Sequence, residues 1–509
     1  MAESIPPDES IDESIRQALE NTPDEYEFRG ILGGGWFGIV YRVYSRKHRR
    51  FFALKMLNKN FRDDIDGQES FRKEANIWIE LGKHPYFVHV YWVDEIAGRL
   101  CIVMECLPKN EAGFISLDDY LRNSPPDIAQ TLRWAIQFCY AMAYAYSKGI
   151  TCHQDIKPTN ILIGPDGDVQ ITDFGLGDSL GAAKPEIEQK ITIEDLTKPQ
   201  IKPKTNGLQS WGYRSHMPPE WWSDKSMCNQ RLDIYSFGIT LFQMINKGDP
   251  PFVGHTDEEC EALHRYAPIP QIASPLFPII ECCLEKSPNE RYQTFDELRS
   301  NLEDLLKSRT GEIIATPILR EMEFWEWNNK GRSRIHLKHC DDALLDFDKA
   351  LKDCPEDCLI LADAWGGKGI CYHVLASVAA HEGRTEAAYE YRDKACLAFY
   401  NATVFDFNNL QAWFNWGNLY STFREDIHAL ECYDWVIQIN PLFAAVWINK
   451  ADCEFDLSES DPDREEEAKK SYKRFIELAD PAQYQSQAQY QSQIDHANEM
   501  LQKLTKKRG

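Results

Sequence analysis

The sequence predicts a multidomain protein in which a mixed α+β domain is followed by an all-α helical repeat. Its 509 residues are enough for at least two domains, each with its own hydrophobic core. From Tyr26 the sequence follows a strand-like pattern, and residues 128–148 then have the periodicity of a long amphipathic helix. After Gly311 the composition shifts towards tryptophan, tyrosine and alanine at helical spacing. We therefore expect the two kinds of domain in this order along the chain.

Composition and charge narrow the class of protein. The net charge of −24 argues against a nucleic acid as the main ligand. No run of eighteen apolar residues is present, so we expect no membrane span. The first residues lack the basic and apolar regions of a signal peptide, and we expect a cytoplasmic protein. The fifteen cysteines include no Cys-x-x-Cys pair, which favours reduced, mostly buried thiols over disulfides or a zinc site.

Three polar residues of the middle region could point into one loop, and a second aspartate, thirteen residues further on, could join them. Asp155 could receive a proton from a substrate hydroxyl, and Lys157 could neutralise a migrating phosphoryl group. Asn160 and Asp173 carry oxygen atoms of the kind that Mg²⁺ prefers. The alternative is that Asp and Asn in turns only cap backbone groups. Four such residues at these offsets are an improbable coincidence, which favours the catalytic interpretation.

A glycine-rich stretch lies near the start of the strand-like region. Gly33, Gly35 and Gly38 fit the pattern G-x-G-x-x-G, and Val40 follows two residues later. Glycine lets backbone N–H groups approach phosphate oxygens. A tight hairpin also favours glycine, so the pattern alone is weak. Because strand-like sequence follows instead of a helix start, the stretch favours a hairpin over ATP rather than a dinucleotide fold.

Together these motifs resemble the eukaryotic-type (Hanks-type) serine/threonine protein kinase family, over residues 26 to about 307. His-x-Asp-x-x-x-x-Asn at 153–160 and Asp-Phe-Gly at 173–175 resemble its catalytic and metal loops. The resemblance implies a bilobal protein-kinase fold, ATP and Mg²⁺ as cofactors, and γ-phosphate transfer to protein hydroxyls. It also implies that Lys55, in a strand, pairs with Glu74, in a helix. A solvated edge residue is the alternative for a lone strand lysine.

The resemblance assigns further residues. It makes Met104 the residue at the back of the nucleotide pocket, and the backbone at Glu105 and Leu107 the adenine contacts. Ordinary core is the alternative for the apolar positions, and both interpretations can hold together. The implied catalytic residues are Asp155, Lys157, Lys55 and Glu74, and the implied metal ligands are Asn160 and Asp173. The implied ATP site consists of Gly33, Gly35, Gly38, Val40, Ala53, Lys55, Met104, Glu105, Leu107 and Leu162.

The chain departs from the family pattern in two places. Gln154 replaces an arginine that normally binds a phosphate on the activation loop, so we expect activity without strict dependence on that phosphate. Regulation by another device stays open. The segment 173–220 is long and lysine-rich, which fits either a mobile loop or acceptance of acidic or phosphate-rich substrates. Ser210 is the candidate for the hydroxyl residue that the family has just upstream of Ala-Pro-Glu, a motif that is Pro-Pro-Glu here at 218–220. Two structural roles are implied besides: Asp233 braces the catalytic loop, and Arg291 pairs with Glu220.

The last third of the chain carries a repeat. Trp327, Gly331, Ala343, Phe347, Ala350 and Pro355 recur in register as Trp413, Gly417, Ala429, Tyr433, Val436 and Pro441. Degenerate units begin at Trp365 and Trp447. This resembles the tetratricopeptide repeat, which implies paired helices and a peptide or protein ligand on the concave face. Asn328 and Arg332 do not reproduce the carboxylate clamp of chaperone-binding repeats.

The expected domain boundaries follow from these motifs. Ile11, Ile15 and Leu19 form an apolar stripe in the acidic N-terminal extension, which we expect to pack on the next domain or stay mobile; partner docking is the alternative. The expected ranges are 1–25 for the extension, 26–107 and 108–307 for the two kinase lobes, 308–323 for a linker, 324–481 for the repeats and 482–509 for a capping helix with a basic tail.

The leading function is an ATP- and Mg²⁺-dependent protein kinase with a docking domain, acting on protein substrates. The alternative is a scaffold in which the kinase fold binds nucleotide or partners without turnover. Inactive relatives of the family usually lose the strand lysine, the catalytic aspartate or the metal aspartate. Lys55, Asp155 and Asp173 are all present, which favours the enzyme.

Overall fold

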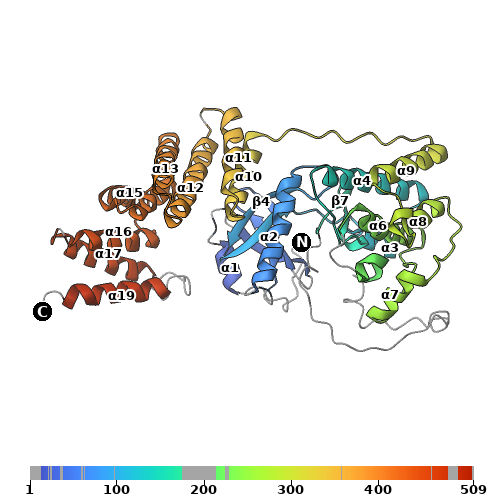
Figure 1. Cartoon of the computed structure of the whole chain (residues 1–509), viewed down its shortest axis with the longest axis horizontal. Helices are drawn as coiled ribbons and strands as arrows, with labels where there is room; N and C mark the ends of the chain where they lie inside the picture. The colour runs from blue at the N-terminus through green and yellow to red at the C-terminus, as the bar shows by residue number, and fades with distance from the viewer. Residues whose placement is uncertain are drawn as a thin grey trace. The chain divides into compact units, whose positions relative to one another are not determined.

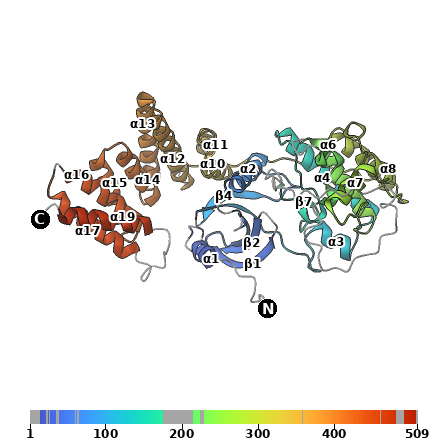
Figure 2. The same cartoon turned by 60° about the horizontal axis from the view of Figure 1, so that its bottom comes forward.

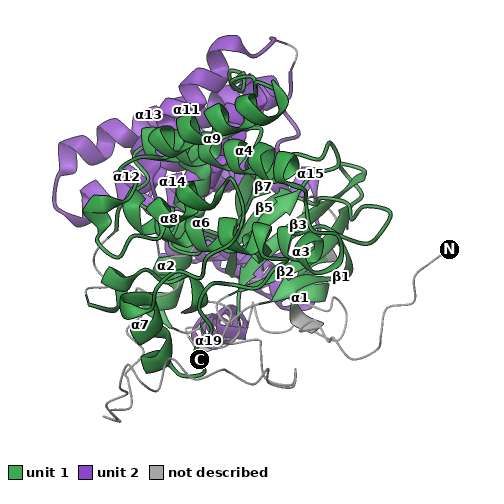
Figure 3. Cartoon of the chain, turned by 90° about the vertical axis from the view of Figure 1, so that its right-hand side faces the viewer, with its two compact units in different colours: residues 1–321 green, residues 322–509 purple. Residues whose placement is uncertain are grey.

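The chain folds into two compact units, residues 1–321 and 322–509 (Figure 3). The division falls within the segment 308–323, although the finer boundaries expected from the sequence stay predictions. The computed structural model describes residues 13–20, 22, 24, 26–34, 38–58, 61, 64–96, 98–174, 214–223, 228–356, 358–459, 461–479 and 491–506.

An antiparallel sheet opens the first unit, with the strand order β1-β2-β3-β5-β4. Its strands are β1 (Tyr26–Gly34), β2 (Gly38–Ser45), β3 (Arg50–Leu57), β4 (Val90–Ile96) and β5 (Arg99–Glu105). Helix α2 (Ile65–Leu81) connects β3 to β4 (Figure 1). It begins after Asp64, whose carboxylate accepts a hydrogen bond from the Gly67 N–H and so caps the helix. The buried positions of α2 include Glu74 and Trp78, one helical turn apart.

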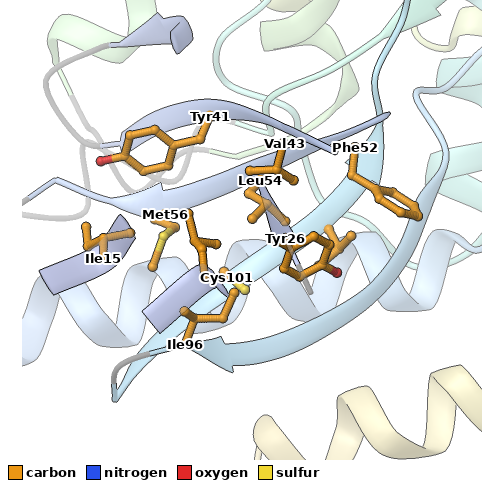
Figure 4. Packing of buried hydrophobic residues seen from close by; sticks show 11 residues of the cluster. Ile15, Tyr26, Tyr41, Val43, Phe52, Leu54, Met56, Ile96 and Cys101 are labelled. Atoms are coloured by element: carbon orange, nitrogen blue, oxygen red, sulfur yellow. The ribbon is translucent and has the colours of Figure 1, made fainter. Parts of the chain in front are cut away.

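Helix α1 (Glu13–Glu20) packs on this sheet. Ile15 and Leu19 lie in one buried cluster with side chains of β1, β2 and β3, among them Tyr26 and Met56 (Figure 4). Full burial of a side chain of this size stabilises a fold by about 1.5–3 kcal/mol. The expected packing of the N-terminal stripe is confirmed for these two residues, whereas Ile11 lies outside the described part of the chain.

A helical part completes the first unit (Figure 2). Its helices are α3 (Leu117–Asn123), α4 (Ile128–Ser147), α6 (Gln230–Ile245), α7 (Asp257–Tyr266), α8 (Phe277–Cys283) and α9 (Phe295–Thr310). Between α4 and α6 lie the paired strands β6 (Ile161–Ile163) and β7 (Val169–Ile171). Helix α6 is buried along most of its length, and Phe237 stacks on Phe138 of α4 with 4.0 Å between ring centroids. The long helix expected at 128–148 is confirmed as α4.

The second unit is helical in the segments that the structure describes. Small residues stand where its helices approach closely: a Cβ atom on Gly331 would lie 2.8 Å from the Phe347 ring, and one on Gly417 would lie 2.5 Å from the Tyr433 ring. The helices are α10 (Phe324–His336), α11 (Cys340–Asp353), α12 (Ile360–His381), α13 (Thr385–Phe405), α14 (Leu410–Thr422), α15 (Asp426–Ile439), α16 (Ala444–Leu457), α17 (Arg464–Ala479) and α19 (Gln491–Lys506). The expected helical region is present, while its assignment to the tetratricopeptide type stays a prediction.

One expectation about cysteines is wrong. Cys152 and Cys228, 76 residues apart, form a disulfide with their Cα atoms 5.6 Å apart. The fold brings together two segments that are distant in sequence, so the spacing of the cysteines carried no sign of the pair. The other thirteen cysteines are free thiols.

Helix length and hydropathy decide whether a segment can span a membrane. Of the helices in the described ranges, none is both long enough and apolar enough to cross a bilayer.

Candidate active site

Lys55 joins two carboxylates that come from different parts of the first unit. Its Nζ atom donates to Glu74 Oε1 at 2.5 Å and to Asp173 Oδ1 at 2.6 Å. Lys55 lies in β3, Glu74 lies on α2, and Asp173 follows β7. The Lys55 and Glu74 side chains are only 10% and 2% exposed. Buried charges persist only when they are paired and hydrogen-bonded, and this lysine bonds to both carboxylates.

The electrostatics of this group keep Lys55 charged. Burial disfavours the charged amine, but Asp173 and Glu74 outweigh burial and raise the pKa of Lys55 above its usual value. Burial also acts to raise the pKa of Asp173, but Lys55 outweighs it and holds that pKa below its usual value. Burial raises the pKa of Glu74 although Lys55 opposes the shift. The site therefore presents a fixed positive charge beside an ionised Asp173.

A second group of polar residues follows α4. Lys157 Nζ lies 2.8 Å from a carboxylate oxygen of Asp155. Asn160 Nδ2 donates to Asp155 Oδ2 at 2.7 Å and to the Asp155 backbone oxygen at 3.0 Å. Burial raises the pKa of Asp155, while Lys157 and the hydrogen bond from Asn160 oppose the shift. The short 3₁₀ turn at Pro158–Asn160 places Asn160 back against the aspartate five residues earlier.

The two groups belong to neighbouring loops. The Thr172 N–H donates to the Asn160 backbone oxygen at 3.0 Å, so the residue before Asp173 is bonded to the end of the catalytic loop. Asp173 itself has a φ of 59°, a left-handed conformation that non-glycine residues adopt at a cost. Phe174 is buried against Trp78 of α2 and against His153, with ring centroids 5.1 and 4.5 Å apart. These contacts hold Asp173 in place from both sides.

Asp233 of α6 holds the start of the catalytic loop. Its carboxylate accepts hydrogen bonds from the His153 N–H at 2.6 Å and the Gln154 N–H at 3.0 Å. Tyr146 donates its hydroxyl to the same carboxylate. Gln154 has a φ of 65°, so this turn needs an anchor. The brace expected from the sequence is confirmed, whereas the part played by Tyr146 left no signal in the sequence.

The glycine hairpin is described in part. Gly33 pairs with Val40, and Gly38 pairs with Leu57. A Cβ atom on Gly38 would lie 3.2 Å from the Met56 backbone oxygen and 3.4 Å from Lys55 Cε. Glycine at position 38 thus avoids a tight contact with the β3 backbone next to Lys55. Gly35 lies outside the described residues.

The apolar residues expected around a nucleotide lie on several strands. Val40 of β2 faces Lys55 in the β2–β3 register, and Ala53 of β3 faces Met104 of β5. Met104 is buried, and the Glu105 N–H donates to the His89 backbone oxygen at 2.8 Å. Leu107, just past β5, is also buried, and Leu162 lies in β6, directly after the catalytic loop. That these side chains together enclose an adenine ring stays a prediction.

The long segment after Asp173 is described only at its end. Arg291 forms a bidentate pair with Glu220, with distances of 2.6 and 2.8 Å from its two terminal nitrogens to the two carboxylate oxygens. The expected pairing of these residues is confirmed. Ser210 and the five lysines between 184 and 204 lie outside the described residues.

Comparison with known proteins decides the family. The protein kinase domain model matches residues 26–302, which is more than half of the chain. The chain belongs to the protein kinase family. Serine/threonine-protein kinase PknD of Protochlamydia amoebophila is 28% identical over 343 residues, which cover 63% of this chain and 34% of that protein. PknB of Mycobacterium leprae is 28% identical over 305 residues, covering 58% of this chain and 44% of that protein.

This kinase chain spans between about a third and under half of the length of the curated relatives that it matches. A probable serine/threonine-protein kinase of Clostridium perfringens is 29% identical over 59% of this chain, and the match covers 41% of that protein. The five-stranded sheet with α2 is the N-terminal lobe of the kinase domain, and the helices from α3 to the first half of α9 lie in the rest of the matched residues 26–302.

Proposed function

We propose that the chain is an ATP- and Mg²⁺-dependent serine/threonine protein kinase that transfers the γ-phosphoryl group to hydroxyls of protein substrates. The observation that carries this proposal is the hydrogen-bonded group of Lys55, Glu74 and Asp173. It places a fixed positive charge and an ionised oxygen ligand side by side, which is what binding of a metal-bound triphosphate requires. The kinase names of the relatives support the same reaction.

The residues of this chain suit a magnesium ion. Asp173 supplies ionised carboxylate oxygens, and its side chain is 33% exposed, so a metal can reach it. Asn160 uses its amide nitrogen for Asp155, which directs its amide oxygen away from that bond. Hard oxygens of this kind, completed by phosphate and water oxygens, are the ligands that Mg²⁺ prefers. A bound Mg²⁺ would neutralise charge on the phosphate oxygens.

The catalytic roles follow from the same contacts. Asp155 would orient the substrate hydroxyl and receive its proton, and the raised pKa of its buried carboxyl suits a proton acceptor. Lys157, 2.8 Å from Asp155, would contact the migrating phosphoryl group. Lys55 would hold the earlier phosphates while Glu74 fixes its position. Catalysis would rest on positioning and electrostatic stabilisation, since phosphoryl transfer needs little covalent help from the protein.

Nucleotide binding would use the hairpin and the strand faces. The backbone at Gly33, Gly35 and Gly38 would approach the phosphates, and Val40, Ala53, Met104 and Leu162 would enclose the base. Because the Glu105 N–H already donates to His89, Glu105 would contact adenine through its carbonyl group. Leu107 would provide the second backbone contact.

The competing function is a scaffold that binds nucleotide without turnover. Binding and transfer measured on the same samples separate the two. We expect the wild type to bind ATP more tightly with Mg²⁺ than without it, and to phosphorylate itself or a generic acceptor. In Asp173→Asn the Mg²⁺-dependent part of binding and the transfer should both be lost. Tight binding with no transfer to any acceptor would favour the scaffold.

We also propose that the helical unit binds a peptide or protein and so selects substrates. The close approach at Gly331 and Gly417 supports paired helices of the tetratricopeptide kind, whose concave face would carry the ligand. Removal of residues 324–509 should leave phosphorylation of a generic acceptor intact and reduce phosphorylation of native partners. Unchanged choice of partner would contradict the docking role. The cytoplasmic location stays a prediction.

A further inference from the structure

The disulfide joins two segments that meet beside the catalytic loop. Cys152 directly precedes His153, the first residue of that loop, and Cys228 directly precedes Asn229, which caps helix α6. The Cα separation of 5.6 Å is in the usual range for a disulfide, so the bond forms without movement of the backbone. The interval between the two cysteines contains the catalytic loop, the metal loop and the long segment that follows them.

The same two segments are also held together by hydrogen bonds. Asp233, in the first turn of α6, accepts hydrogen bonds from the N–H groups of His153 and Gln154. The disulfide therefore adds a covalent link to the hydrogen bonds by which Asp233 holds the backbone at His153 and Gln154. Because Gln154 has a left-handed backbone, which costs a non-glycine residue free energy, a second anchor helps to hold this turn.

Gln154 contacts the disulfide directly. Its amide Nε2 donates to Cys228 Sγ at 3.4 Å, and Thr151 Oγ1 lies 3.4 Å from the same sulfur. An amide is neutral, so Gln154 cannot hold a phosphate by charge. Gln154 instead contacts the segment before α6 through the hydrogen bond from its amide to the Cys228 sulfur.

We propose that the Cys152–Cys228 disulfide is a redox-sensitive anchor of the catalytic loop, in which the oxidised form is the more active kinase. Oxidation fixes the turn at His153 and Gln154, and reduction removes the covalent link and leaves the turn to the Asp233 brace and its other non-covalent contacts. The effect on activity rests on the proposed kinase function, whereas the effect on the loop does not.

The chemistry is thiol–disulfide exchange with a small disulfide such as oxidised glutathione. Cys228 is half-buried and Cys152 is 3% exposed, so Cys228 is the sulfur that a small molecule reaches. The Cys228 thiolate attacks one sulfur of the small disulfide and releases one thiolate. The Cys152 thiolate then attacks the Cys228 sulfur of the mixed disulfide and releases the second. Two protein thiols are oxidised to one disulfide, and the small disulfide is reduced to two thiols.

The first test measures the bond and the loop without using activity. The full chain is equilibrated with oxidised glutathione or with dithiothreitol, and peptides are mapped by mass spectrometry alongside amide hydrogen exchange. We expect a peptide linked through Cys152 and Cys228 in the oxidised sample only. Exchange at the His153 and Gln154 amides should be roughly tenfold faster in the reduced sample, because local opening then breaks fewer contacts. Absence of the linked peptide, or equal exchange in both samples, would overturn the proposal.

The second test measures kinase activity in the same two states. We expect kcat/KM to fall roughly tenfold on reduction, within the effect of up to about 10²-fold that small misplacement of catalytic groups produces. The kcat/KM of Cys228→Ser should equal that of the reduced wild type and should be the same in both redox states. The substitution is made at Cys228 because a substitution at the buried Cys152 could destabilise the fold. Cys358→Ser removes a partly buried thiol of the second unit and should respond to redox state as the wild type does.

The two tests separate this proposal from the kinase function. Equal activity of oxidised and reduced enzyme, with the bond shown to open, would overturn the anchor. A Cys228→Ser variant that still responds to redox state would do so as well. If no form transfers phosphate, the proposed function fails, and hydrogen exchange alone decides whether the disulfide holds the loop.

Discussion

Lys55 and Asp173, 118 residues apart in the sequence, are joined by a hydrogen bond of 2.6 Å between Nζ and Oδ1. Glu74 accepts a second bond from the same amine. One side chain therefore links β3 of the sheet, helix α2 and the loop that follows β7. A shift of α2 would move Glu74 and so change the hydrogen bonds of Lys55. The packing of the N-terminal lobe therefore affects the position of the positive charge that a triphosphate would meet.

Replacement of Lys55 by methionine should lower both activity and stability. The change removes the charge and leaves buried Glu74 without its ion pair, which costs about 3 kcal/mol, the lower end of the range for a broken buried pair. Phosphate transfer should fall by at least about 10²-fold, the loss expected when one electrostatic contact to the transition state is removed. Thermal unfolding and initial-rate assays measure the two effects.

Lys73→Met is the matched control for that prediction. Lys73 lies next to Glu74 on α2 but is exposed. Its replacement should change the unfolding free energy by no more than about 0.5 kcal/mol and leave transfer intact. Equal losses in both variants would show that Lys55 acts only through the general charge of the lobe.

Gly38→Ala should weaken ATP binding more than it weakens the fold. The added Cβ would lie 3.2 Å from the Met56 backbone oxygen and 3.4 Å from Lys55 Cε, so the β3 backbone beside Lys55 must give by a few tenths of an ångström. We expect the KM for ATP to rise roughly tenfold, equivalent to about 1.4 kcal/mol of lost binding. Gly34→Ala adds the same methyl group where no described atom lies within 4 Å, and should leave the KM within about twofold of the wild type. A larger effect at position 34 than at 38 would contradict this explanation.

The stability of the first unit should depend on the ionisation of Asp233. Burial raises the pKa of its carboxyl to about 6, above the usual value of 3.8, although hydrogen bonds from Tyr146, His153 and Gln154 oppose the shift. Between these values the folded state binds more protons than the unfolded state, so the contribution of this group to stability falls as the pH rises from about 4 to 6. The change is at most about 3 kcal/mol, the linkage value for a shift of about two units.

Asp233→Asn measures that contribution, because the asparagine does not titrate. The difference in unfolding free energy between wild type and variant should decrease between the two pKa values and stay constant above them. Denaturant unfolding at several pH values measures the difference. A difference that increases over this interval would mean that the folded state lowers, rather than raises, the pKa of the carboxyl.

At two adjacent glycines of α12, replacement by alanine should have opposite effects on the stability of the second unit. A Cβ atom on Gly367 would lie 2.3 Å from the Phe347 ring, whereas one on Gly366 would meet Ala402 Cβ at 4.0 Å. Gly367→Ala should destabilise the second unit by about 1–3 kcal/mol through overpacking. Gly366→Ala should stabilise it by up to about 0.5–1 kcal/mol through helix propensity. Thermal unfolding compares the two variants, and similar stabilities would contradict the close approach of α12 to α11.

The residues that the sequence could assign are those whose chemistry requires fixed spacing. Asp155, Asn160 and Asp173 occur in short motifs, as expected for a loop that would arrange a proton acceptor and metal ligands and that would tolerate few other lengths. Lys55 and Glu74 were assigned from the same family pattern, and the hydrogen bond between them agrees with it. The brace by Asp233 and the pair between Arg291 and Glu220 were found in the same way.

The contacts that the sequence could not assign depend on the fold rather than on local spacing. Cys152 and Cys228 meet only because the start of helix α6 lies against the catalytic loop, and neither cysteine has a partner at a characteristic distance in the chain. The hydroxyl of Tyr146 reaches Asp233 for the same reason, and nothing sets it apart from the other tyrosines of α4. The sequence predicts the apolar stripe that includes Ile15 but leaves open whether it is covered, because a stripe does not reveal its packing partner.

Phosphate transfer by Asp155→Asn decides whether the catalytic loop performs the chemistry proposed for it. The substitution keeps the size of the side chain and removes the proton acceptor. The full chain is incubated with Mg²⁺ and γ-labelled ATP, beside the control Asp166→Asn, a change at an exposed residue of the turn between β6 and β7. We expect wild type and control to transfer label at equal rates, and Asp155→Asn to lose at least about 10²-fold. Equal transfer by all three proteins would contradict the assignment of Asp155.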